Sequence, residues 1–220
     1  MIKIEKQAEP REWTEYRLTP GADYEAKPFL AKSLLDEQGY ICAYCMRRIP
    51  HCDKGSNESH RVEHIKCRDR YDDLKLVYSN MLICCPGNIN GYWHCDKLKD
   101  NDDISFSPFD QNFIDSLGYK SHDDTIFSTN PVWDWELNKV LNLNNALLMQ
   151  NRKSVLKGVI SMLNRNRGKD GAWKKAGVKA VLDKWKVKHL ERFKDEGECY
   201  VYYPYCGIVI WYLEKLYRRI

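Results

Sequence analysis

Closely spaced cysteines mark the part of the sequence with the clearest capacity for chemistry. Cys42 and Cys45 are separated by two residues, the adjacent Cys84 and Cys85 follow further along the chain, and Cys95 comes after them. A Cys-x-x-Cys turn can aim two sulfurs at one point, and four such thiolates complete the tetrahedral shell that Zn²⁺ prefers. The sequence therefore predicts a structural zinc site, with Cys42 and Cys45 as its first two ligands.

Acid, imidazole and amide side chains lie between these cysteines. Glu63 and His64 end one short apolar run, Asn80 opens another, and His94 and Asp96 flank the last cysteine. A metal-dependent nuclease needs a base that deprotonates water and oxygen ligands for a divalent ion. An imidazole titrates near pH ~6.5, so His64 is a candidate base, while Glu63 is a candidate ligand for the ion.

The Glu63-His64 pair has two interpretations. Neighbouring side chains on a strand point to opposite faces, so both can serve one site only if the strand ends or twists there. Otherwise the pair is an exposed carboxylate beside a packing histidine. Asn80 favours the first interpretation, because an amide that donates and accepts can bridge the loop backbone and fix the direction of the His64 segment.

This order of residues resembles the HNH endonucleases, which have a ββα-metal fold. It is most similar to the HNH nuclease subunit of Septu-type antiphage defence systems, the PtuB type, which also occurs beside retrons. The resemblance covers roughly residues 28–165 and is carried by Cys-Ala-Tyr-Cys-Met-Arg-Arg-Ile at 42–49, Val-Glu-His-Ile at 62–65, Tyr-Ser-Asn-Met-Leu at 78–82, Cys-Pro-Gly-Asn at 85–88 and His-Cys-Asp-Lys at 94–97.

The resemblance implies roles for the polar residues. His64 would be the general base, Glu63 a ligand of the catalytic ion and Asn80 the central asparagine. In most relatives a histidine directly follows the last cysteine, whereas here that place holds Asp96, and His94 precedes the cysteine. Asp96 ranks slightly ahead as a ligand for Mg²⁺, and His94 would favour a softer ion such as Mn²⁺.

The same pattern completes the zinc site. Cys95 is the expected fourth ligand, and Cys85 is expected rather than the preceding cysteine because it lies five residues past Asn80, as in the family. A rival set of ligands would use His51 and Cys52. A zinc-ribbon module that binds nucleic acid without catalysis, or a purely structural subunit of a defence complex, remains the alternative function.

Composition and charge limit the class of protein. The 220 residues are 43% hydrophobic, which is typical of a folded globular chain, and they suit one compact unit with appendages. No apolar run is long enough for a membrane span and the first residues lack a secretory core, so a cytoplasmic location is expected. In a reducing compartment the close cysteines are expected to bind metal rather than to form disulfides.

Basic residues concentrate in the last third of the chain. Residues 151–220 contain 17 Lys or Arg against 7 Asp or Glu, whereas residues 1–150 contain 18 against 24. These charges are either solvated helix faces or a surface for a polyanion. Basic residues that could contact phosphates near the site or on the C-terminal helices are Arg47, Arg48, Lys66, Arg68, Lys97, Lys184, Lys186 and Lys188.

The resemblance also implies partners. These are a nucleic acid, either DNA or RNA, and an ATPase subunit of the PtuA type, together with a retron reverse transcriptase and its RNA in some assemblies. The segment from Ile208 to Leu213 is apolar on nearly all sides. It is either a central helix of this chain or, around Trp211 and Tyr212, the place where the ATPase docks.

Hydrophobic periodicity and turn residues predict the elements that position the site. Pro28 and Gly39 bound a helix, residues 61–65 and 74–83 are strands, and a short helix covers 95–98. A hairpin joins 113–114 to 126–127 across Gly118, and helices start near 144, at 173 and after Pro204.

The predicted fold class is α+β. It consists of a small ββα-metal HNH core with a zinc knuckle, followed by a mostly α-helical C-terminal region. The expected divisions are an extended lead-in (1–27), the nuclease core (28–110), an acidic hairpin and linker (111–143) and a basic helical region (144–220).

Overall fold

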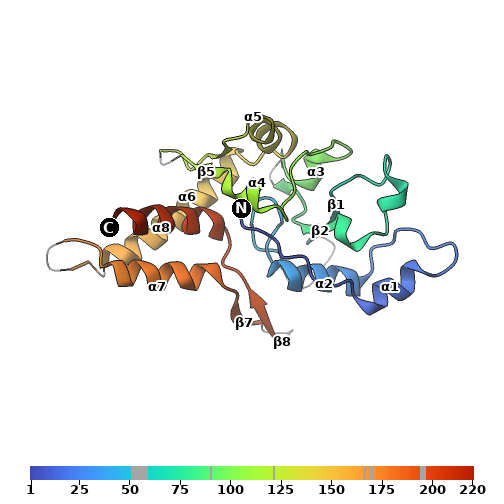
Figure 1. Ribbon diagram of the computed structural model, residues 1–220, viewed down its shortest axis with the longest axis horizontal. Helices are drawn as coiled ribbons and strands as arrows, with labels where there is room; N and C mark the ends of the chain where they lie inside the picture. The colour runs from blue at the N-terminus through green and yellow to red at the C-terminus, as the bar shows by residue number, and fades with distance from the viewer. Residues whose placement is uncertain (51–58, 90, 121, 166, 169–170, 194–196) are drawn as a thin grey trace.

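The computed structural model of the protein describes residues 1–50, 59–89, 91–120, 122–165, 167–168, 171–193 and 197–220. These residues form a mixed α and β structure with eight α-helices and four two-stranded antiparallel sheets (Figure 1). The helices are α1 (Arg11–Arg17), α2 (Pro28–Gln38), α3 (Asp96–Lys99), α4 (Gln111–Asp115), α5 (Pro131–Trp135), α6 (Ala146–Arg165), α7 (Lys175–Lys186) and α8 (Cys206–Arg219). The paired strands are β1 (Arg61–His64) with β2 (Met81–Cys84), β3 (Asn88–Ile89) with β4 (Tyr92–Trp93), β5 (Leu117–Tyr119) with β6 (Ile126–Ser128), and β7 (His189–Phe193) with β8 (Gly197–Val201).

The β1–β2 pair carries the predicted site residues. His64 lies opposite Met81 at one end of the pair, and all four residues of β2 are buried, as expected for a continuous apolar run. The backbone of Ile83 in β2 is also engaged on its other side. The Gln38 side chain accepts from the Ile83 amide and donates to the Ile83 carbonyl, both at 2.8 Å, and the Ala43 amide donates to the same carbonyl. The end of α2 and the first cysteine turn are thereby fixed to β2.

Helix α2 begins and ends where the sequence predicts. Pro28 occupies its first turn, and Gly39 adopts the left-handed conformation (φ 61°) just after its last residue. A Cβ atom on Gly39 would lie 2.6 Å from the Tyr202 ring, so glycine is needed for space as well. The Lys188 ammonium donates to the carbonyls of Asp36 and Glu37, so a residue from the far end of the chain covers the end of α2.

The N-terminal lead-in differs from the expectation. Residues 1–27 are not extended throughout, because α1 forms within them. Trp13 of α1 is completely buried, and its indole N–H donates to the Leu76 carbonyl at 3.0 Å. Ile4 is buried as well, and its amide donates to the Pro108 carbonyl. One aromatic side chain and a few long-range contacts order a segment that has too little periodicity to reveal a helix.

The middle of the chain also departs from the prediction at several points. Strand β2 starts at Met81 rather than at residue 74, and the preceding residues form short 3₁₀ turns. The expected loop before Trp93 contains the β3–β4 pair. Phe113 lies in α4, and Gly118 lies within strand β5 instead of at a turn. A Cβ atom on Gly118 would meet the Phe127 ring at 2.5 Å, which explains a glycine inside a strand.

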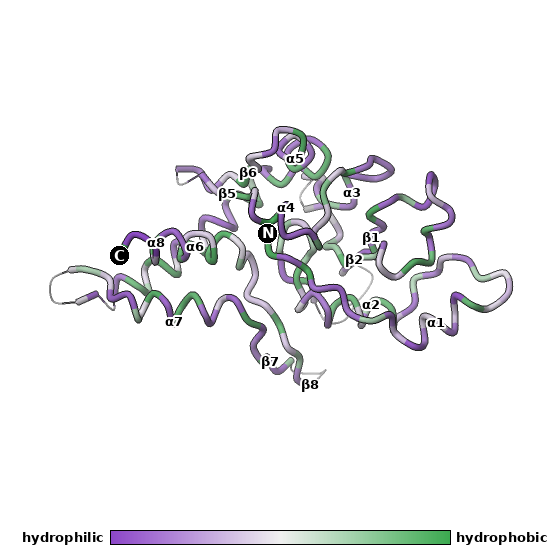
Figure 2. The backbone as a smooth tube through the Cα atoms, viewed as in Figure 1, coloured by the Kyte–Doolittle hydropathy of each residue, from purple (hydrophilic) through white to green (hydrophobic). Residues whose placement is uncertain are grey.

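The C-terminal region is mostly helical, as predicted, with one exception. Helices α6, α7 and α8 gather in the half of the molecule away from β1 and α3 (Figure 1). Apolar and polar residues alternate along α7, as the changing colours in Figure 2 show. The second helix does not extend through Leu190 and Phe193, which belong to β7. Val187 ends α7 in an extended conformation, and the burial of β7 then alternates along the strand.

One face of helix α8 is buried in the hydrophobic core. Ile208, Val209 and Leu213 are buried, whereas Trp211 and Tyr212 are half-buried. The segment therefore packs within the chain, as the first interpretation expects, and Trp211 and Tyr212 keep a partly exposed face; docking of an ATPase stays a prediction. Among the described residues, no helix has both the length and the apolar character that a bilayer crossing requires.

Candidate metal centre and adjoining polar pocket

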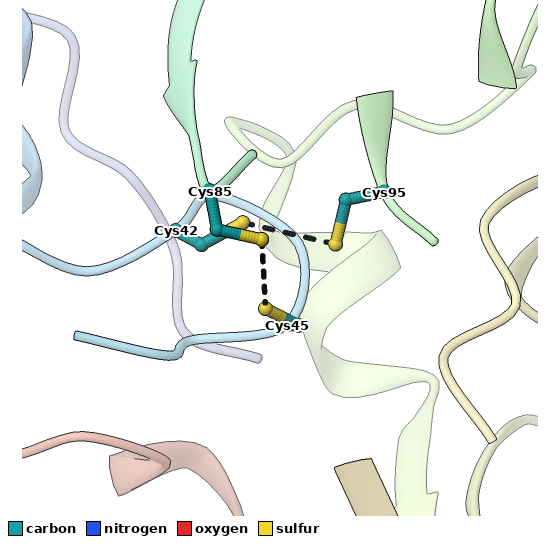
Figure 3. Close-up of side chains that lie close together, drawn as sticks. All are labelled: Cys42, Cys45, Cys85 and Cys95. Atoms are coloured by element: carbon teal, nitrogen blue, oxygen red, sulfur yellow. Dashed lines mark hydrogen bonds between the residues drawn. The ribbon is translucent and has the colours of Figure 1, made fainter. Parts of the chain in front are cut away.

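The four predicted cysteines converge on one point (Figure 3). Their sulfur atoms all lie within 4.8 Å of one another and all four residues are buried. Cys42 and Cys95 are 3.8 Å apart, and Cys45 and Cys85 are 3.7 Å apart. A tetrahedral site with Zn–S bonds of ~2.3 Å places its sulfurs about 3.8 Å from one another. The cluster therefore fits a structural zinc ion, and it is the one group of three or more potential ligands found in the described part of the chain.

Tight turns bring these sulfurs together. In the first turn the Met46 amide donates to the Cys42 carbonyl, and Met46 has a positive φ of 61°. In the second, the His94 amide donates to the Gly87 carbonyl at 2.8 Å, and Gly87 has a φ of 70°. A Cβ atom on Gly87 would lie 2.4 Å from the His94 carbonyl oxygen. Cys95, with a φ of 55°, then immediately precedes α3.

The structure places only one of the two adjacent cysteines in the cluster. Cys85 belongs to the cluster, and Cys84 is buried but is not a member of it. Burial alone would raise the pKa of Cys42, but hydrogen bonds from the neighbouring thiols lower the pKa well below its usual value. Burial raises the pKa values of Cys45 and Cys95 instead, so the convergence of the four sulfurs, and not the pKa shifts, carries the assignment. The rival ligands His51 and Cys52 lie outside the described residues.

Glu63 is buried beside the metal centre and has several polar partners. It is 2% exposed, and its Oε1 accepts a hydrogen bond from the Tyr44 hydroxyl at 2.8 Å. The same oxygen lies 3.0 Å from the ammonium of Lys99, which is completely buried and also donates to the His64 carbonyl. Burial raises the pKa of Glu63 well above its usual value, and a hydrogen bond with Asp96 adds to this effect.

Asp96 lies next to Glu63, as its proposed role requires. Its carboxylate accepts a hydrogen bond from Arg61 Nε at 2.5 Å. Burial tends to raise the pKa of Asp96, but the hydrogen bonds from Glu63 and Arg61 outweigh it and lower the pKa. Two adjacent carboxyl groups can bind a divalent ion, and two cations, Lys99 and Arg61, compensate them here. Among the described residues, Glu63 and Asp96 are therefore two candidate ligands for a divalent ion, and no third ligand group lies close enough to complete a site with them.

His64 stands at the end of β1 and is only 5% exposed. Its Nε2 lies 3.0 Å from the Lys75 carbonyl, which can only accept, so Nε2 carries the proton and Nδ1 keeps a lone pair. The Tyr24 ring packs edge-on against the imidazole, with centroids 4.6 Å apart, and the Arg68 guanidinium covers the same tyrosine. Burial lowers the pKa of His64 to about 4, so the ring is neutral at physiological pH.

Asn80 makes the bridge that the sequence suggests. Its Oδ1 accepts from the Lys66 amide at 2.9 Å, and its Nδ2 donates to the carbonyls of Lys66 and Leu74. Because Lys66 follows His64 by two residues, these bonds fix the chain where it leaves β1.

His94 lies with the cysteines instead of with the carboxylates. It is completely buried, its Nε2 is 3.6 Å from the Cys85 sulfur and its Nδ1 is 3.0 Å from the Tyr92 carbonyl. It does not line the pocket that Asp96 lines. Of the two alternatives for the third ion ligand, this placement favours Asp96.

A polar pocket of about 200 Å³ opens beside these groups. It is lined by Arg61, Val62, Glu63, His64, Cys67, Arg68, Asp69, Asp96, Lys97, Asp100 and Asn101. Arg68 and Lys97 are exposed at this pocket, so two of the predicted phosphate contacts are placed beside the candidate base. The pocket therefore combines carboxylates, a neutral imidazole and basic groups.

The other predicted basic contacts are not gathered at the pocket. Arg47 and Lys66 are half-buried, and Lys66 lies 3.7 Å from Asp103. Arg48 donates to Glu191 at 3.2 Å. In the C-terminal region, Lys186 pairs with Glu214, Lys188 covers the end of α2, and Lys184 lies over the Tyr203 ring. These lysines have separate structural contacts and do not form one continuous phosphate-binding face.

Three site residues were missed by the sequence argument. Lys99 follows Asp96 by three residues on a short helix, so a shared helix face was a signal for it. Tyr44 stands inside the first cysteine turn, and Tyr24 is distant in sequence from His64. No local spacing indicates the partners of these two tyrosines.

No protein-family model matches the chain, and a search of curated proteins finds no significant match.

Proposed function

We propose that the protein is a metal-dependent endonuclease of the HNH type, which hydrolyses phosphodiester bonds in DNA or RNA. The observation that carries the proposal is the polar pocket, which collects Glu63, His64 and Asp96 beside a cysteine cluster that fits zinc. Strand β1 supplies Glu63 and His64, helix α3 supplies Asp96, and β2, which pairs with β1, lies between them in the chain, as in the order of the ββα-metal fold.

His64 is the proposed general base. Its Nε2–H is held by the Lys75 carbonyl, which leaves Nδ1 as the atom that accepts a proton from water. A pKa of about 4 keeps the ring neutral at physiological pH, so no prior deprotonation is needed, but it also makes the imidazole a weaker base than a solvated one. Asn80 positions this residue indirectly, by fixing the backbone that follows β1.

Glu63 and Asp96 are the residues that would hold Mg²⁺ or Mn²⁺. Such an ion would polarise the phosphate and stabilise charge on the departing 3′ oxygen, so the products would carry 5′ phosphates. Arg68 and Lys97 are the proposed contacts to the nucleic-acid backbone, because both are exposed and line the pocket. His64 lines the pocket, and Tyr24 packs edge-on against its imidazole.

A second candidate function is a non-catalytic zinc module that binds nucleic acid or stabilises a larger assembly. One observation favours it: the Glu63 carboxylate already has Lys99 and Tyr44 as partners, and Tyr24 covers His64. A buried network of this kind can serve stability alone.

The resemblance to PtuB-type nucleases extends the proposal to a biological setting. The protein would act in the cytoplasm as the nuclease of an antiphage system, with an ATPase subunit and, beside retrons, a reverse transcriptase and its RNA. Half-buried Trp211 lines a groove of about 750 Å³ with residues of α4, α8 and the N-terminal segment, which makes it the proposed place for ATPase docking. Trp211→Glu is expected to abolish co-purification with that subunit.

Cleavage assays separate the two candidate functions. Wild type, His64→Ala and His122→Ala are incubated with plasmid DNA and with RNA in Mg²⁺ or Mn²⁺, with and without the ATPase. Loss of a general base should slow cleavage by about 10²–10⁴-fold. The control His122 is well exposed and pairs only with neighbouring Asp123 among the ion pairs of the described residues, so its variant should cleave normally. Equal cleavage by the His64 and His122 variants would refute the assignment of the base.

A further inference from the structure

We propose that Tyr44 is a positioning residue, which links the zinc-binding turn to the orientation of the Glu63 carboxylate. The inference rests on the proposed function, because it assigns Glu63 to the ion. It concerns how the two metal sites of one protein depend on each other.

The turn that holds the first two cysteines also holds Tyr44. The residue lies between Cys42 and Cys45, is 1% exposed, and donates its hydroxyl proton to Glu63 Oε1 at 2.8 Å. Backbone bonds on both sides fix the turn, from the Ala43 amide to β2 and from the Met46 amide to the Cys42 carbonyl. The direction of the tyrosine ring is therefore set by the same backbone that aims the sulfurs.

The second zinc-binding segment reaches the same carboxylate oxygen. Helix α3 begins directly after Cys95 and places the Lys99 ammonium 3.0 Å from Glu63 Oε1. Each half of the cysteine cluster thus sends one donor to Oε1, and the Glu63 carboxyl group also hydrogen-bonds to Asp96. Asp96, the second proposed ion ligand, directly follows Cys95.

The affinity of Glu63 and Asp96 for the catalytic ion should therefore depend on the turn that carries the zinc ligands. A buried carboxylate that loses one of two fixed donors can rotate, and the two carboxylates then present their oxygens less well to an ion. Removal of a group that orients a metal ligand typically costs about 10–100-fold in metal affinity or activity. Tyr44→Phe removes only the hydroxyl and keeps the buried ring, so the packing of the turn is retained.

The chain offers a matched control. Tyr40 is completely buried beside the same turn and donates its hydroxyl proton to a different carboxylate, Asp36, at 2.7 Å. Tyr40→Phe therefore removes the hydroxyl of a completely buried ring, and with it a part-buried hydrogen bond to the exposed Asp36, without touching Glu63. Both variants are prepared as full chains with zinc.

Three measurements test the proposal: zinc content by elemental analysis, Mn²⁺ affinity by electron paramagnetic resonance, and cleavage kinetics. For Tyr44→Phe we expect full zinc content, an Mn²⁺ dissociation constant raised about 10-fold or more, and a lower kcat with an unchanged KM for nucleic acid. Tyr40→Phe should match wild type in Mn²⁺ affinity and kcat. Raising the Mn²⁺ concentration should restore most of the kcat of Tyr44→Phe.

Other outcomes overturn the proposal. Wild-type Mn²⁺ affinity in Tyr44→Phe shows that the hydroxyl orients nothing, and equal losses in both variants, or loss of zinc, show a merely structural role. The proposed function can fail separately: if wild type binds Mn²⁺ but cleaves nothing, the nuclease assignment is wrong and the affinity comparison still decides the role of Tyr44. If wild type binds no Mn²⁺ at this site, both are wrong.

Discussion

The buried pair formed by Lys99 and Glu63 allows a quantitative test of the site that does not depend on catalysis. The ammonium lies 3.0 Å from Glu63 Oε1, and the two side chains are 0% and 2% exposed. With an effective dielectric constant of ~20, unit charges at this distance attract each other by about 5–6 kcal/mol before the cost of desolvation is subtracted. This value is an upper bound, because burial and Asp96 raise the pKa of Glu63 and so favour its neutral form. Removing one partner of such a pair typically costs about 3–5 kcal/mol, because the other charge stays buried.

Lys99→Met should fall at the lower end of that range. Burial and Asp96 already raise the pKa of Glu63, so its carboxylate can take up a proton once the ammonium is gone. A loss of about 3 kcal/mol in the free energy of unfolding lowers the Tm by roughly 6–12 °C in a chain of this size.

A double-mutant cycle isolates the pair. Urea unfolding of the zinc-loaded wild type, Lys99→Met, Glu63→Gln and the double variant gives the coupling energy, for which we expect about 2 kcal/mol. Glu63→Gln alone should also destabilise the protein, since it removes the carboxylate that pairs with the buried Lys99 ammonium. The same double change at exposed Lys179 and Asp183, an i,i+4 pair, should show a coupling of at most about 0.5 kcal/mol. A Lys99–Glu63 coupling as small as that surface value would refute the reasoning.

Further predictions concern the cysteine cluster and the basic residues. Cys85→Ala should lose bound zinc whereas Cys84→Ala should keep it, as measured by elemental analysis, because only the first belongs to the cluster; the opposite pattern would reverse the assignment. Gly87→Ala should destabilise the protein by more than about 1 kcal/mol in urea unfolding, since φ is 70° and the added Cβ would lie 2.4 Å from a backbone carbonyl oxygen. Lys188→Met should lower the free energy of unfolding by about 1 kcal/mol, because it removes hydrogen bonds to the end of α2, and it should leave the salt dependence of nucleic-acid binding unchanged. Lys184→Met should not affect stability, because Lys184 only lies over the Tyr203 ring. If nucleic-acid binding by the Lys188 variant depended less steeply on salt concentration than binding by wild type, Lys188 would be a phosphate contact after all.

The parts of the structure that could be predicted are those encoded by residue type and short spacing. The cysteine pairs identify the candidate metal ligands because few other residues have their chemistry. Pro28 and Gly39 delimit α2 because proline has a restricted φ and glycine can adopt a positive φ. The order of β1, β2 and α3 around Glu63 follows from similar local signals.

The missed parts depend on contacts between distant segments. Helix α1 is held by the burial of Trp13, and the start of β2 is displaced by turns that its apolar residues do not reveal. The partners of Glu63, which are Tyr44 and Lys99, come from segments on either side of it in the sequence. Periodicity reports which face of an element is buried, and it carries no information about which polar group meets another across the core.

The cysteine cluster has a consequence for how the chain tolerates the loss of metal. A metal held there would connect Cys45 to Cys85, 40 residues apart, and Cys42 to Cys95, 53 residues apart. By analogy with a disulfide, cross-linking a 40-residue loop removes about 4 kcal/mol of conformational freedom from the unfolded chain. The chelated ion would thus act as a removable staple across the segment that carries Glu63, His64 and Asn80. Withdrawing it should turn that segment into the first place where proteases cut, and readdition of Zn²⁺ should restore its resistance.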